Sequence, residues 1–214
     1  MSRCFPCRCI AGCCVAALAI GLLASRSFSA DDAAKKAAAE KQAAEMAEYM
    51  KMSAPGPEHD KLKEMEGDWA ASVKMFSPDG SEMGPPSSGV MHCKMILGGR
   101  YLQLNYDGNM SGAGGMSMPF RGMGLSGYDK TKKKYTNVWI DEMSTGMMMT
   151  EGTCTGDVLT STGEMPDPMT GKICKVKEVH TMKDKDHHTY EMYMTEGGSD
   201  KEMKVMEIEY TRKA

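Results

Sequence analysis

Three runs near the C-terminus decide the fold: KICKVKEVHTMK (172–183), HHTYEMYMT (187–195) and EMKVMEIEYTR (202–212). Each has the length of a β-strand, and the short segments between them carry the Asp and Gly residues typical of turns. Successive residues of a strand point to opposite faces, so in each run one face is more apolar and the other is more charged. The pattern predicts two consecutive antiparallel hairpins.

The same texture extends back to Trp69, with short strand-like runs separated by turn residues and without helical periodicity. The remaining predicted strands lie near Trp69–Phe76, Gly89–Leu97, Arg100–Tyr106, Phe120–Tyr128, Lys134–Asp141, Met147–Thr155 and Val158–Glu164. Ten strands joined in sequence favour an all-β fold, an antiparallel meander closed into a barrel, because closure removes exposed strand edges. A barrel of this size has room for one small ligand.

The N-terminus has the features of a secretory signal peptide, predicted over Met1–Ala30. Its apolar run, Cys9–Ala24, is shorter than the roughly 20 residues that a spanning helix needs. We expect cleavage near Ser29 or Ala30, and an exported, periplasmic or extracellular protein with no transmembrane segment. Ile10–Cys13 resembles a lipoprotein box, which would lead to lipidation, but it opens the apolar run instead of closing it.

Residues 31–55 form a predicted linker between the signal peptide and the barrel domain at 56–214. Asp31–Met52 is rich in Ala, Lys, Glu and Gln and has no Gly or Pro, which predicts a helical tether. Ser53–Pro57 breaks this helix and marks the domain boundary. One further short helix is predicted over Glu58–Glu66, where Leu62 and Met65 are spaced three apart.

Composition excludes some classes of function and leaves others open. The 26 basic and 29 acidic side chains give a net charge of -3, which disfavours binding to nucleic acid. Removal of the signal peptide leaves Cys93, Cys154 and Cys174, which permit one disulfide and one thiol, or three thiols. Their spacing gives no support for a zinc or redox motif. The sequence identifies no cofactor and no protein partner.

The segment from Gly56 to Lys213 resembles the bacterial family known as domain of unknown function 1579. The resemblance is carried by Gly56-Pro57-Glu58-His59, Gly67-Asp68-Trp69, Ile96-Leu97-Gly98-Gly99-Arg100, Pro119-Phe120-Arg121-Gly122, Gly127-Tyr128-Asp129, Trp139-Ile140-Asp141, Asp167-Pro168-Met169-Thr170-Gly171 and Tyr210-Thr211-Arg212-Lys213. It implies a barrel similar to the calycins, which include lipocalins, and no established activity. It also implies a structural pair, Trp69 on the first strand and Arg212 covering its indole from the last strand.

A polar cluster inside the barrel follows from an assumed register of the two C-terminal hairpins. If the first turns at Lys185-Asp186, His180 faces Glu191 and Glu178 faces Tyr193. The same face is otherwise mostly apolar, whereas the opposite face carries five charged residues, so the cluster is expected in the lumen. A turn one residue longer would invert this assignment.

Two more residues, Trp139 and Asp141, share a strand face with Tyr135 and are expected to line the lumen. We therefore predict a ligand-binding site made of Glu178, His180, Glu191, Tyr193, Trp139 and Asp141 for a small, largely apolar molecule. The alternative is that the polar cluster is a satisfied hydrogen-bond network that only fixes the barrel.

Two other functions are weighed against ligand binding. The chain has 24 Met, and three Met-x-Met spacings, at Met116/Met118, Met147/Met149 and Met192/Met194, place two thioethers on one strand face, which suits copper(I). Met is also an adaptable filler of cores, and this explains its even spread along the chain. A hydrolase or isomerase would use the Glu178/His180/Glu191 cluster, although no catalytic motif accompanies it.

Overall fold

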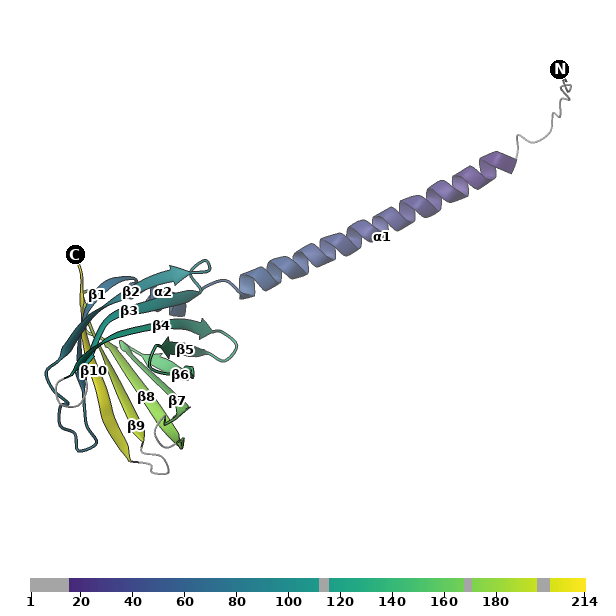
Figure 1. Cartoon of the computed structure of the whole chain (residues 1–214). Helices are drawn as coiled ribbons and strands as arrows, with labels where there is room; N and C mark the ends of the chain where they lie inside the picture. Colours follow the sequence, from purple (N-terminus) through teal and green to yellow (C-terminus); the bar gives the residue numbers. More distant parts are fainter. Residues whose placement is uncertain (1–15, 112–115, 168–170, 196–200) are drawn as a thin grey trace, which may run out of the picture. The chain divides into compact units, whose positions relative to one another are not determined.

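The computed structural model describes residues 16–111, 116–167, 171–195 and 201–214 (Figure 1). These residues contain two helices and ten strands. The helices are α1 (Ala16–Met52) and α2 (Pro57–Glu64), and the strands are β1 (Gly67–Met75), β2 (Ser87–Ile96), β3 (Tyr101–Ser111), β4 (Ser117–Asp129), β5 (Lys134–Asp141), β6 (Met148–Thr155), β7 (Val158–Pro166), β8 (Ile173–Met182), β9 (His187–Thr195) and β10 (Glu202–Arg212). The chain divides between Ala54 and Pro55 into two units, one with α1 and one with the remaining elements.

Helix α1 extends through the segment predicted as a tether. Its exposed part carries ion pairs one turn apart, such as Lys35 with Asp31 and Lys41 with Glu45, which add a few tenths of a kcal/mol each. The helix starts at Ala16, before the predicted start at Asp31. Within the described part of the chain, neither helix combines the length and apolar character needed to cross a bilayer.

The second unit is a closed ten-stranded antiparallel barrel, as predicted. Consecutive strands pair from β1 to β10, and β10 returns to β1 with Trp69 opposite Arg212 and Met75 opposite Met206 (Figure 1). All ten predicted strands are present, and β3 and β4 are longer than predicted because Asn109–Ser111 pairs with Ser117–Pro119. The residues between these two strands, 112–115, lie outside the described part.

The barrel interior is built by the inward face of each strand, and α2 packs at one end of it. Trp69 and Leu102 are fully buried there together with Leu62 from α2. Hydrogen bonds hold the helix in place, from Tyr135 Oη to the Glu58 carbonyl at 3.1 Å and from Trp69 Nε1 to the Met65 carbonyl at 2.8 Å. The apolar spacing in α2 thus serves the barrel core.

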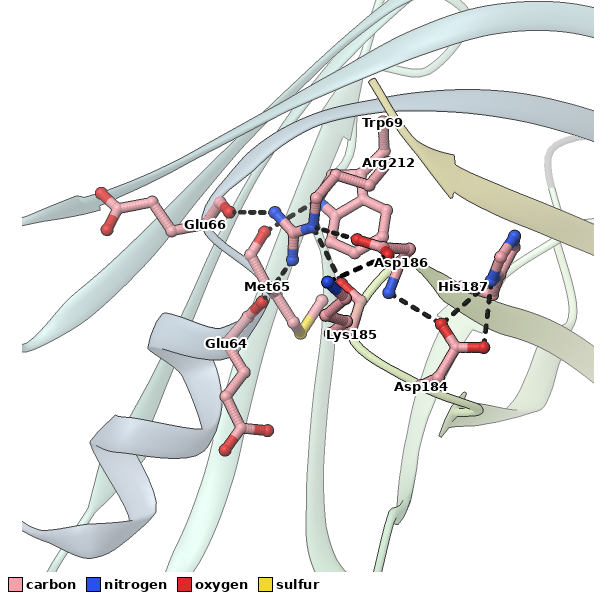
Figure 2. Close-up of polar contacts among 9 residues, drawn as sticks. All are labelled: Glu64, Met65, Glu66, Trp69, Asp184, Lys185, Asp186, His187 and Arg212. Atoms are coloured by element: carbon pink, nitrogen blue, oxygen red, sulfur yellow. Dashed lines mark hydrogen bonds and ion pairs between the residues drawn. The ribbon is translucent and has the colours of Figure 1, made fainter. Parts of the chain in front are cut away.

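Arg212 ties three segments together at this end. Its guanidinium lies 4.0 Å from the centre of the Trp69 ring, as the family resemblance implies. It donates hydrogen bonds to the carbonyls of Glu64, Glu66 and Lys185 at 2.9, 2.7 and 2.8 Å (Figure 2). Asp186 lies within ion-pair distance, 3.5 Å from Nε. Arg212 therefore joins the end of α2 and the β8–β9 hairpin to the first strand.

The registers of the last two hairpins differ from the predicted ones by one residue each. In the first, Met182 pairs with His188 and the Lys183 amide donates to the His187 carbonyl, so three residues (184–186) form the turn where two were predicted. The Asp184 carboxylate accepts hydrogen bonds from the Asp186 amide and from His187. In the second, the predicted register holds from Glu202 to Lys204, after which a β-bulge shifts it. As a result, the side chains of β8 and β10 point to the predicted faces of the sheet, whereas those of β9 point to the opposite faces.

All three cysteines of the barrel are free thiols. Cys93 and Cys174 are buried and Cys154 is half-buried. Burial raises the pKa of the Cys93 thiol to about 12, so it stays protonated. Of the two alternatives left open by the sequence, the structure shows three thiols.

Candidate functional site

The inverted β9 changes the composition of the predicted cluster. Glu191 pairs in register with Val179 and not with His180, and its carboxylate forms an ion pair with Lys204. Tyr193 pairs with Lys177, whose ammonium group lies 4.6 Å from the centre of the tyrosine ring. The predicted placement of Glu191 and Tyr193 in the lumen is therefore wrong, because the longer turn moves both to the other face of β9.

Tyr193 lines a groove of about 360 Å³ across β7, β8, β9 and β10 instead. The groove also presents charged side chains, including Lys177 and Glu202, which form an ion pair with each other. Since charged groups of both signs line it, this groove does not match the apolar ligand expected from the sequence.

Glu178 does face inward, and its carboxylate is fully engaged by hydroxyl groups. Thr150 Oγ1 donates to Oε2, and Tyr190 Oη donates to Oε1 at 2.7 Å. Burial and the neighbouring carboxylate raise the pKa of Tyr190 well above its usual value, so the phenol stays a donor. Asn137 Nδ2 donates to Thr150 and Ser161 at 3.1 Å each, which extends the network across β5, β6 and β7.

His180 is also inside, and its partner is a second histidine, His188, which the predicted register left outside the lumen. His180 Nε2 and His188 Nδ1 lie 2.6 Å apart, which is a hydrogen bond in which one ring donates and the other accepts. His188 stacks on Tyr210 at 4.4 Å and meets the edge of Trp69 at 4.3 Å. Burial lowers the pKa of His180 to about 4 and that of His188 to about 2, so both rings are neutral at pH 7.

Three buried polar atoms on the inner wall have no hydrogen-bond partner among the described residues. They are His188 Nε2, Tyr106 Oη and Ser87 Oγ, on side chains that are 3%, 6% and 7% exposed. Buried polar groups are nearly always paired, because an unpaired one costs about 1–3 kcal/mol. These three atoms are therefore the candidates to bind a ligand.

The register places these atoms along one arc of the wall. His188, Tyr210, Ala71 and Gly89 follow one another across β9, β10, β1 and β2. The Tyr106 hydroxyl lies over Gly89, where a Cβ atom would come within 2.3 Å of it. The close approach requires glycine at position 89, and the small Ala71 separates the Tyr106 side from Tyr210 and His188.

Apolar side chains make up the wall around this arc. Met75, Met206 and Met192 are register neighbours on β1, β10 and β9 and lie beside Glu178 on β8. Met75 and Met206 are only partly buried, as is Phe120, although all three pack against the core. Flexible thioethers adapt to ligands of irregular shape, so this wall suits an apolar molecule.

Trp139 and Asp141 lie on the inner face of β5, as the alternation predicts. The indole of Trp139 covers Gly122 and Gly124 on β4, where an added Cβ would meet the ring at 2.2 and 3.0 Å. Its Nε1 donates to Asp141 Oδ2 at 3.1 Å, and the other oxygen accepts from the Met143 amide. Trp139 therefore adds aromatic surface to the inner wall and already has its own polar partner.

The other two hypotheses find less in the structure. Within the described segments, no group of three or more His, Cys, Asp or Glu side chains has metal-binding geometry. Met116, Met118, Met147 and Met149 are exposed, and Met192 is buried among the apolar side chains. The catalytic cluster predicted from sequence is not assembled, because Glu191 faces away from Glu178 and His180.

Sequence reasoning missed His188, Tyr190 and Tyr106 as residues of the inner wall. The first two were missed only because of the turn length, and the Asp184-x-Asp186 pattern, which favours an Asx turn, was the available signal. Tyr106 alternates correctly with Leu102 and Leu104 on β3, so the strand period alone would have placed it inside.

Comparisons with known proteins support the same fold. The sequence model of a family described as "Protein of unknown function (DUF1579)" matches residues 54–212. The crystal structure of Rv2717c from M. tuberculosis is 16% identical, and the match covers 75% of this chain and all of that one with a TM-score of 0.50. A Nostoc punctiforme protein of the DUF3598 family, of unknown function, is 7% identical over 74% of this chain and all of its own, with a TM-score of 0.23.

The two solved structures differ in how closely they resemble this fold. At 16% identity, Rv2717c supports the barrel fold and nothing about activity, and the second likeness is too weak to carry an argument. No curated protein matches the sequence. The family match covers the whole barrel and about three quarters of the chain, so this protein is a member of the DUF1579 family.

Proposed function

We propose that the protein binds a small, largely apolar molecule in the interior of its barrel. The observation that carries this proposal is the arc of three buried polar atoms without protein partners, His188 Nε2, Tyr106 Oη and Ser87 Oγ. Ligand sites in proteins combine an apolar wall with a few polar groups that fix orientation, and this arc has both features. We also propose, from the predicted signal peptide, that the protein is exported and meets its ligand outside the cytoplasm.

Two sets of polar groups share the interior and would have different roles. Glu178 is satisfied by Thr150 and Tyr190, which is what a network that fixes the barrel requires. His180 positions His188 through their shared hydrogen bond and leaves His188 Nε2 available. Glu178 and His180 would therefore support the site, and the ligand's polar end would meet His188, Tyr106 and Ser87.

The apolar body of the ligand would lie against the sulfur and aromatic side chains. Trp139, Phe120, Met75 and Met206 are partly buried and pack against the core from the inner face. A ligand that removed more of their surface from water would gain about 25 cal/mol for each Å² covered. Affinity would come mainly from this contact, and the polar arc would select among ligands.

A matched pair of substitutions tests whether the interior is the site. Ala71 faces inward within the arc and is 4% exposed, whereas its neighbour Ala70 is exposed on the outer face. Ala71→Leu fills the interior and Ala70→Leu does not. We expect Ala71→Leu, but not Ala70→Leu, to weaken binding of the uncharged fluorescent probe N-phenyl-1-naphthylamine by about tenfold or more.

Native mass spectrometry of the protein purified from its own host supplies the second readout. A co-purifying small molecule retained by the wild type and by Ala70→Leu, and lost from Ala71→Leu, would agree with the proposal. Ala71→Val is the smaller variant to use if overpacking by leucine unfolds the barrel. A wild-type protein with neither a bound molecule nor probe uptake would refute it, as would equal binding by both variants.

A further inference from the structure

We infer that the interior site takes an uncharged amphiphile, one with a hydroxyl, carbonyl or amide end, and excludes amphiphiles with a carboxylate or sulfonate end. This inference rests on the proposed function and adds the chemical class of the ligand. It follows from the charges that face the interior and from those that do not.

The interior charges are acidic. Glu178 is the only buried carboxylic side chain in the described ranges, since the other buried polar residues are Ser, Thr and His. Asp141 adds a second carboxylate on the inner face of β5. An anionic ligand end would lie in the same interior as these two groups, and like charges repel more strongly there than in water.

No cation among the described residues is buried beside the candidate site. Arg212 is committed to three backbone carbonyls and to the Trp69 ring. On the outer face, Lys204 pairs with Glu191 and Glu207. A carboxylate that entered the interior would lose its hydration without gaining a counterion, which is among the most unfavourable changes in a protein interior.

The imidazoles do not supply the missing charge. His180 and His188 share one hydrogen bond, and burial keeps the pKa of both well below neutral pH. His188 packs against Trp69 and Tyr210, and the neighbouring groups that act on its charge, His180 and the Arg212 cation, both disfavour a protonated ring. Two of the three unpaired atoms are hydroxyls, which both donate and accept, and the third is a neutral ring nitrogen. Such a set matches an uncharged polar end.

Two probes that differ by one group test the inference directly. N-phenyl-1-naphthylamine is uncharged, and 1-anilinonaphthalene-8-sulfonate is the same molecule with a sulfonate added. Titration of the full chain at pH 7.5 is expected to give an affinity for the uncharged probe at least about tenfold higher than for the sulfonate, or about 1.4 kcal/mol.

Glu178→Gln identifies the source of the discrimination. The amide has nearly the same shape, and the hydroxyls of Thr150 and Tyr190 can still bond to it if one of them becomes the acceptor. We expect the variant to reduce the ratio of the two probe affinities by about threefold or more, because it binds the sulfonate probe more tightly. Asp141→Asn, which removes the other inward charge at a less buried position, is the second variant if Glu178→Gln does not fold.

Met149→Lys is the matched control for dye bound elsewhere. Met149 is 61% exposed on the outer face of β6, so the substitution is expected to leave both titrations unchanged. Equal affinities for the two probes in the wild type, or an unchanged affinity ratio in both charge-removing variants, would overturn the inference but not the proposed function. A wild type that binds neither probe would overturn the proposed function itself, and the inference with it.

Discussion

Arg212 provides the sharpest test of how the barrel is held closed at the α2 end. Its three hydrogen bonds come from a charged donor, and each such bond contributes about 1.5–3 kcal/mol. The contact with the Trp69 indole adds about 0.5–2 kcal/mol. The side chain is 28% exposed, so water would solvate part of what is freed. We therefore expect Arg212→Ala to lower the free energy of unfolding by about 4 kcal/mol.

The assay is urea denaturation of the full chain followed by tryptophan fluorescence, with the slope of the transition checked between variants. Arg212→Lys keeps the charge and can keep one carbonyl contact, so its loss is expected to be about half as large. Arg121→Ala is the matched control, because Arg121 forms an exposed ion pair with Glu142 and its removal should cost less than about 1 kcal/mol. A loss for Arg212→Ala no larger than that of the control would refute the reasoning.

Two further predictions concern the interior. His180 and His188 are neutral when folded but gain protons in the unfolded chain below its pKa of about 6.5. The contribution of these two neutral rings to the free energy of unfolding is therefore complete above pH 6.5 and is lost as the pH falls. We expect the free energy of unfolding to decrease by about 4 kcal/mol in total between pH 7.5 and 5, which urea titrations at several pH values will measure. Gly152→Ala would place a Cβ 2.1 Å from the Thr160 carbonyl oxygen and should cost about 2 kcal/mol or more by the same assay, whereas the unobstructed Gly146→Ala should be close to neutral. Stability that did not change with pH, or equal effects of the two glycine variants, would contradict these assignments.

The fold could be predicted from the sequence because its signals are local. Strand-length runs with turn residues between them fixed the number and order of the strands, and closure followed from the need to pair the edges. The contact between Trp69 and Arg212 could be expected from the family resemblance, and the register now places the two residues opposite each other.

The site could be predicted only in part, because strand register depends on single residues. An extra residue in the turn that holds Asp184 and a bulge after Lys204 each shift the pairing by one position. The first shift turns β9 over relative to β8, and the second turns β10 back, so only β9 is inverted. Glu178 and His180 on β8 were therefore placed correctly, whereas Glu191 on β9 was not. Neither an Asx turn of odd length nor a bulge has a strong sequence signature, so the predicted register left His188 outside the lumen.

The most direct test of the interior site is the nitrogen spectrum of the histidine side chains. Long-range ¹H–¹⁵N correlation at pH 6 should show His180 and His188 as neutral rings. Addition of N-phenyl-1-naphthylamine should then shift the His188 resonances and leave those of the exposed His187 and His92 in place. A His188 ring that titrates near pH 6.5, or that does not respond while the probe binds, would contradict an interior site built around it.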